Sequence, residues 1–168
     1  MSRKGRLTRK ACIVGLQAQI GFVDVLKTGN NGKWENLHGN VIAESGSDHA
    51  KLIKLLRDAG SDADYVVSTV DAVTESGDFI VADGSGTRIV PYVSNTKVIV
   101  LVGANKVVAD VETGKDRLSS YVYALESARV RKVYGWPGAY LAHALTISTN
   151  GAVPGRIHFV IVKEHFGF

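Results

Sequence analysis

The segment STVDAVTESGDFIVADGSGTRIV, residues 68–90, contains charged side chains that could carry out acid–base chemistry or bind a ligand. Asp71 follows a β-branched, apolar run, and a carboxylate where a buried strand ends can act as a general acid or base or bind a hydroxyl group. Glu75 supplies a second carboxylate four residues later. Asp71 and Glu75 are therefore the candidate catalytic residues, and a loop aspartate that caps the residues after it is the alternative for Asp71.

Two Gly-containing stretches could bind an anion. The sequence DGSGTR combines flexible backbone amides with one guanidinium, although two glycines also suit an ordinary hairpin turn. The sequence GANK follows an apolar run and offers a lysine as a point charge and an asparagine as a hydrogen-bond donor, with a solvated turn as the alternative. The candidate ligand-binding residues are Gly15, Asp83, Gly84, Gly86, Thr87, Arg88, Gly103, Asn105, Lys106 and Arg117.

The elements that must position these residues alternate between apolar runs and amphipathic stretches. The predicted strands are 11–14, 64–70, 78–82, 87–90, 97–103, 130–135 and 156–164. The predicted helices are 16–29, 47–60, 116–130 and 137–145. Residues 30–40 are predicted to form a loop. This alternation predicts an α/β fold with a mostly parallel sheet and an antiparallel hairpin around DGSG. Ligands bind beyond the carboxyl ends of parallel strands, so the ends at Gly15, Asp71, Gly103 and Gly135 should share one edge.

The positive charge of the chain is concentrated at its N-terminus. The net charge is +4, and residues 1–10 contain five bases and no acid, which leaves 15 bases against 16 acids elsewhere. We expect residues 1–10 to form a flexible basic tail and residues 11–168 a single domain. The tail either binds RNA or another anionic surface or is simply solvated. Its basic residues are Arg3, Lys4, Arg6, Arg9 and Lys10.

Composition excludes several other classes of protein. The single cysteine, Cys12, excludes a disulfide within these 168 residues, and the five histidines do not have the spacing of a zinc motif. No apolar run is long enough to cross a membrane, and a signal peptide is not expected. We therefore expect a cytoplasmic protein with no metal site, no cofactor of its own and no membrane insertion.

Two regions of the sequence resemble the LUD domain family, the lactate-utilisation proteins. ADYVVSTVDAVTESGDFIVADGSGTRI and KVIVLVGANKVVADVETGKDRL lie within residues 63–118, and GRIHFVIVKEHFGF ends the chain. The resemblance implies a three-layer α/β/α fold similar to ribose-5-phosphate isomerase and the CoA transferases. It also implies that the aspartate matching Asp71 serves in a sugar-phosphate site in that broader superfamily, and that iron–sulfur oxidoreductase subunits are partners.

The sequence departs from the family where an anion would be expected to bind. A Gly-Gly-Ser type of loop is replaced by Gly15, Leu16, Gln17 and Ala18, and the chain is short for the family. Two functions follow. The first is a subunit or accessory factor of lactate or 2-hydroxy-acid utilisation that binds a small anionic metabolite. The second is a non-catalytic protein that docks on RNA, a ribonucleoprotein or an acidic protein surface. Whether the protein is an enzyme stays open, and either function is compatible with a homo-oligomer.

Overall fold

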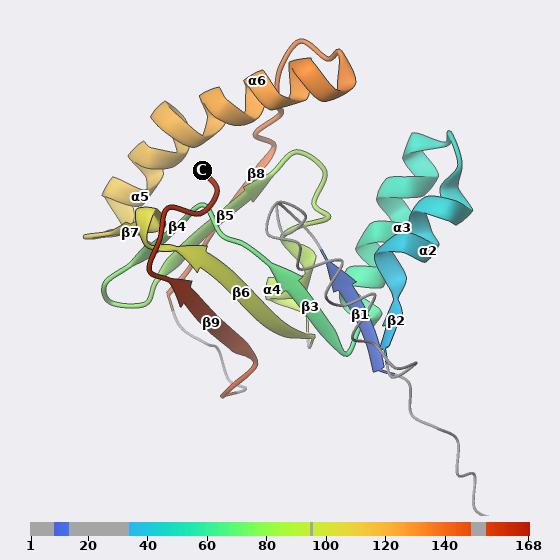
Figure 1. The fold of residues 1–168 in the computed structure, drawn as a ribbon, viewed down its shortest axis with the longest axis horizontal. Coiled ribbons are helices and arrows are strands. Elements are labelled where there is room, and N and C mark those ends of the chain that lie inside the picture. Colours follow the sequence, from blue (N-terminus) through green and yellow to red (C-terminus); the bar gives the residue numbers. More distant parts are fainter. Residues whose placement is uncertain (1–8, 14–33, 95, 149–153) are drawn as a thin grey trace, which may run out of the picture.

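The structure, a computed structural model, describes residues 9–13, 34–94, 96–148 and 154–168. These residues form a mixed α/β fold with a mostly parallel sheet, as the alternating pattern predicts (Figure 1). The main sheet has five parallel strands. In spatial order they are β2 (Trp34–Asn36), β1 (Arg9–Ile13), β3 (Tyr65–Ser68), β6 (Lys97–Gly103) and β9 (Ile157–Val162).

A second sheet of four strands holds the antiparallel part of the fold. In spatial order its strands are β7 (Val107–Val108), β4 (Ala72–Thr74), β5 (Phe79–Asp83) and β8 (His143–Ile147). The β5 strand pairs antiparallel with both β4 and β8, whereas β4 and β7 are parallel. The chain passes from the main sheet to this one within the three residues 69–71.

The main core lies between the two sheets. Val98, Val100 and Val102 alternate along β6, so they share one face of the main sheet, and they pack with Phe79 and Val81 of β5. These five side chains are at most 2% exposed. The near-continuous apolar run of β6 is typical of a strand that is buried on both faces.

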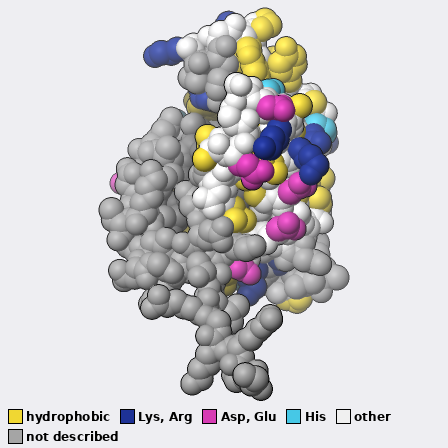
Figure 2. All heavy atoms as spheres, turned by 90° about the vertical axis from the view of Figure 1, so that its right-hand side faces the viewer, with side chains coloured by type: hydrophobic (Ala, Val, Ile, Leu, Met, Phe, Trp, Pro, Cys, Tyr) yellow, Lys and Arg dark blue, Asp and Glu magenta, His cyan; other side chains and the backbone are white. Residues whose placement is uncertain are grey.

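Helices cover the remaining apolar surfaces. The helices α2 (Leu37–Ser45) and α3 (His49–Asp62) form a small core with Val66 of β3. Asp48 caps α3 by accepting a hydrogen bond from Lys51 N. The outer surface of these helices carries basic and acidic side chains side by side (Figure 2).

A long helical segment covers the outer face of the second sheet. It consists of α5 (Val111–Arg117), a π-helical turn (Leu118–Val122) and α6 (Tyr123–Tyr134). Leu118 and Val122 pack on Ala72, Ile80 and Ala82 of the sheet. In the described ranges the other helices are α4 (Val90–Val93) and the 3-10 turn Ala104–Lys106. None of the described helices is both long and apolar enough to cross a membrane.

Several predicted elements are wrong. Residues 87–90 are not a strand; β4 and β8 are the antiparallel neighbours of β5, and α4 begins at Val90 with Pro91 in its first turn. Residues 130–135 are not a strand either, because α6 runs to Tyr134 and Gly135 caps it at φ 68°. Short apolar runs such as these fit a helix or a strand equally well, so their neighbours in space decide.

The remaining corrections concern loops and edges. The predicted helix at 137–145 is wrong, because β8 occupies His143–Ile147, where antiparallel bonds to β5 outweigh local helix preference. The predicted loop at 30–40 contains β2 and the start of α2. The predicted helix at 16–29 lies outside the described residues. The basic segment is only partly described: Arg9 and Lys10 are the first residues of β1.

Candidate functional site

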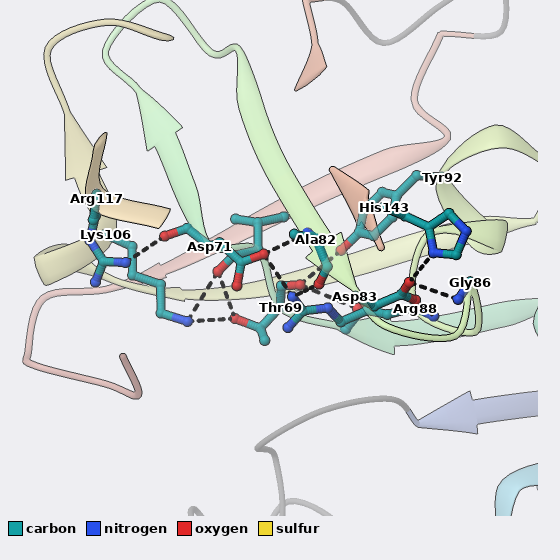
Figure 3. A network of polar contacts seen from close by, with 12 residues as sticks. Thr69, Asp71, Ala82, Asp83, Gly86, Arg88, Tyr92, Lys106, Arg117 and His143 are labelled. Atoms are coloured by element: carbon teal, nitrogen blue, oxygen red, sulfur yellow. Dashed lines mark hydrogen bonds and ion pairs between the residues drawn. The ribbon is translucent and has the colours of Figure 1, made fainter. Parts of the chain in front are cut away.

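The candidate site lies where the chain leaves the main sheet for the second sheet. After β3 ends at Ser68, Thr69, Val70 and Asp71 lead directly into β4 at Ala72. The backbone of Asp71 continues the ladder of the second sheet, since Asp71 N donates to Ile80 O at 2.8 Å. Side chains from three more distant parts of the chain converge on this connection (Figure 3).

The Asp71 carboxylate is buried and paired. Its side chain is 3% exposed, and Oδ2 accepts hydrogen bonds from Ala82 N and from Arg88 Nη2, each at 2.7 Å. Asp71 thus takes the place of a strand residue beside β5 and does not cap a following helix. Arg88 also donates to Ala82 O, while its Nε is buried without a partner among the described residues.

Lys106 approaches the same connection from the 3-10 turn after β6. The residue is 1% exposed, and Nζ donates to Val70 O at 3.0 Å and to Thr69 Oγ1 at 3.1 Å. Both acceptors are uncharged. Burial lowers the pKa of Lys106 from 10.5 to about 8; Asp71 opposes this shift, and the nearby guanidinium groups add to it.

Arg117, the last residue of α5, contributes a third cation. Its Nη1 donates to Asp71 O at 2.7 Å, and its guanidinium lies over the Tyr121 ring, 5.2 Å from the centroid. Partial burial lowers the pKa of Arg117, although Tyr121 and Asp71 favour its charged form.

Three basic side chains therefore converge on residues 69–71, where Asp71 supplies one buried carboxylate and only Arg88 contacts it directly. With every group ionised, Asp71 compensates only one of the three positive charges. A cluster of this kind favours an anion, because arginine and lysine form their strongest hydrogen bonds with carboxylate or phosphate oxygens. A nearby negative charge would also offset the burial of the Lys106 ammonium group. We call Asp71, Arg88, Lys106 and Arg117 the cation cluster.

Asp83 organises the loop that carries Arg88. Its Oδ1 accepts from Gly86 N at 2.7 Å and lies 3.2 Å from His143 Nδ1, and its Oδ2 accepts from Arg88 N at 2.7 Å. Gly86 has φ +81°, a conformation that side chains other than glycine rarely adopt. Thr87 lies in the same loop, where its hydroxyl is 3.0 Å from Ser85 Oγ.

Several predicted ligand-binding residues contact other parts of the chain. Asn105 binds the C-terminal segment, accepting from Phe166 N and donating to Gly167 O, each at 2.9 Å. A Cβ on Gly103 would lie 2.6 Å from Phe166 N, and a Cβ on Gly84 would lie 2.7 Å from Tyr140 O, so close backbone packing accounts for both glycines.

The other predicted residues fall outside this cluster. Glu75 is exposed in the turn after β4, where its backbone N donates to Val108 O. Gly15, Arg3, Lys4 and Arg6 lie outside the described residues.

Sequence reasoning missed two residues of the site and one neighbour of its loop. Thr69 accepts the Lys106 hydrogen bond, and its backbone O accepts from Tyr92 OH at 3.2 Å. Burial raises the pKa of Tyr92. His143 lies opposite Asp83 in the β5–β8 pairing. The sequence signal for Thr69 was its position two residues before Asp71, but no local pattern marks Tyr92 or His143.

Within the described ranges there is no group of three or more His, Cys, Asp or Glu that could hold a metal ion.

The fold and the cation cluster define an α/β domain with a candidate anion site at the end of a central strand. The chain belongs to the LUD domain family, whose sequence profile matches residues 9–162. No curated protein matches the chain.

Two of the solved structures that are similar to this chain show the extent of the likeness. One is a DUF162 family protein from Deinococcus radiodurans, 18% identical, with a TM-score of 0.48; the match covers 95% of this chain and 77% of that one. The other is a CMP N-glycosidase from Clostridium botulinum, 12% identical, with a TM-score of 0.43; the match covers 92% of this chain and 88% of that one.

Proposed function

We propose that this protein binds a small anionic metabolite at the cation cluster, as a subunit or accessory factor in the utilisation of lactate or related 2-hydroxy acids. The observation that carries the proposal is Lys106, a buried ammonium group whose described hydrogen-bond partners are both uncharged. Burying a charge is costly unless it is paired, and Asp71 is already bound to Arg88. An anion close to Lys106 Nζ would remove that cost.

The arrangement suits a carboxylate or phosphate group more than a neutral ligand. Arg88 and Arg117 offer planar guanidinium groups that can bind two oxygens at once, and Lys106 adds a point charge. Asp71 then serves to position Arg88 through its 2.7 Å contact and to limit the excess of positive charge. Membership of the LUD domain family supports lactate, pyruvate and related acids as the first ligands to test, and iron–sulfur oxidoreductase subunits as partners.

Ligand-induced stabilisation tests the proposal directly. The melting temperature of the protein would be measured with lactate, pyruvate, ribose 5-phosphate, inorganic phosphate and coenzyme A, against sodium chloride of equal ionic strength. A ligand at about 100 times its dissociation constant stabilises the native state by about 2.7 kcal/mol, which is easily detected. We expect at least one carboxylate or phosphate compound to stabilise the wild-type protein.

Matched variants identify the site. Lys106→Met removes the buried charge and should abolish the stabilisation, whereas Lys132→Met removes an exposed lysine on α6 and should preserve it. The absence of a shift with every compound would refute the proposal. A shift that Lys106→Met retains in full would place the anion elsewhere on the protein.

The uneven charge of the chain supports the second function, docking on RNA, a ribonucleoprotein or an acidic protein surface. A basic segment of this kind should give association that weakens steeply with salt, because binding releases condensed counterions. Binding of a fluorescent single-stranded RNA should then be lost when residues 1–8, which precede β1, are deleted. Equal binding by the full-length and shortened proteins would exclude this role for the segment.

A further inference from the structure

The last strand of the chain forms one edge of the main sheet. β9 pairs with β6 and with no other strand among the described residues, and it lies at the end of the sheet (Figure 1). Its other edge therefore presents backbone N–H and C=O groups that the described strands do not use. Such an edge is a template for pairing with another strand.

The side chains of β9 lack the features that normally prevent edge pairing. Residues 157–162 contain no proline, lysine, arginine or acid. Val160 is 47% exposed and Ile161 is 53% exposed. The register with β6 places Val160 beside Leu101 and Ile161 beside Val102, so the two residues lie on opposite faces of the sheet. Neither face is well covered at this point.

The other described sheet edges are shorter or expose fewer apolar side chains. β7 has two residues and β2 has three, and both are short for a stable pairing. The exposed side chains of β8 are the small or polar Ala144 and Thr146. Among the described strands, a long and apolar sheet edge is thus found at β9 alone.

We propose that β9 is a self-association surface, at which β9 of a second copy adds antiparallel to form a continuous ten-stranded sheet. A twofold axis brings a surface against itself, and two copies of one strand related by an axis perpendicular to the sheet are antiparallel. Strand addition also shields residues on both faces at once. A helix laid on the sheet would cover Val160 or Ile161 but not both.

Symmetry restricts the register of this pairing. Directly opposite residues must point to the same face, so in each pair the two residue numbers must both be odd or both be even. A register centred on Val160 places Val160 opposite its own copy and Phe159 opposite Ile161. It also places Arg156 opposite Glu164, although the Arg156 guanidinium is already engaged on its own chain, where it donates to Pro91 O, Thr96 O and Tyr92 O. Lys163 then lies opposite Ile157 and avoids the other Lys163.

The oligomeric state in solution tests the surface. The wild-type protein should show a molar mass of twice the 18.0 kDa chain by light scattering, falling on dilution. Val160→Lys should give a monomer with an unchanged circular dichroism spectrum, because it places two like charges at the axis. Val93→Lys, at an apolar residue of α4 that is 67% exposed, should leave the dimer intact. A wild-type monomer at every concentration, or a dimer that persists in Val160→Lys, would overturn the proposal.

A cysteine pair tests the register without depending on that variant. In a Cys12→Ser background, Val160→Cys should form an intermolecular disulfide on mild oxidation, since opposite residues of antiparallel strands are about 4.5–5.5 Å apart. Ile161→Cys is the matched control. Its two copies lie diagonally, about 7–8 Å apart, and should crosslink much more slowly. Faster crosslinking of Ile161→Cys than of Val160→Cys would reject this register.

Discussion

Replacing Lys106 by methionine should remove a characteristic rise of stability with pH. The pKa of this lysine is about 8 in the native protein and would be near its ordinary value of 10.5 in the unfolded chain. At about 1.4 kcal/mol per pH unit, that difference corresponds to roughly 3 kcal/mol of destabilisation while the group is charged in both states. The magnitude follows from burial, since the residue is 1% exposed.

The sign of the effect follows from proton binding. Below pH 8 the lysine is protonated in both states, and the native state bears the full cost of its burial. Between pH 8 and 10.5 the native lysine loses its proton first, so the unfolded chain binds more protons and stability rises with pH. Most of the roughly 3 kcal/mol should be recovered by pH 10.

Urea denaturation between pH 7 and 10 measures this contribution. The difference in unfolding free energy between the wild-type protein and Lys106→Met should grow with pH in favour of the wild type, while Lys132→Met should follow the wild type. At pH 7 the effect of Lys106→Met should be small, because removing a buried charge is offset by leaving Thr69 Oγ1 and Val70 O without their donor. A difference that is independent of pH would refute the argument that Lys106 is buried and charged without a counterion.

The same measurement connects stability with ligand binding. An anion beside Nζ favours the protonated lysine and should raise its pKa towards the ordinary value. The wild-type pH profile should therefore flatten when a stabilising anion is present at saturation. An unchanged profile with a bound anion would show that the anion does not contact Lys106.

Three further substitutions test the architecture of the site. Asp71→Asn should lower the unfolding free energy in urea by on the order of 3 kcal/mol, because Arg88 loses its buried counterion, and a loss below 1 kcal/mol would contradict this. Asp83→Asn should cost about 1–3 kcal/mol in the same assay, since an amide NH₂ would face a backbone N–H donor of the loop; wild-type stability would argue against these contacts. Gly103→Ala should displace the C-terminal segment, because its Cβ would lie 2.6 Å from Phe166 N, and unchanged hydrogen exchange at that amide would contradict the packing.

The local sequence determined the elements with strong patterns. The amphipathic repeat of α3, the apolar run of β6 and the β-branched run of β3 each predict their element, because a single face or a fully buried position must be apolar. The position of Asp71 just beyond β3 also follows from where the apolar run ends. The motifs in residues 63–118 and 155–168 were also sufficient to indicate the LUD domain family.

Only the tertiary structure decided which short segments became strands and which charges met. β8 is a strand because β5 supplies its hydrogen-bond partners from about 60 residues away, and no local pattern records that. Asp71 meets Arg88 and Arg117 across 17 and 46 residues of chain, and Lys106 reaches the neighbouring Val70 across 36, so their convergence depends on how two sheets pack. Local sequence specifies which groups are charged, whereas the fold determines which of those charges are buried together and left short of a counterion.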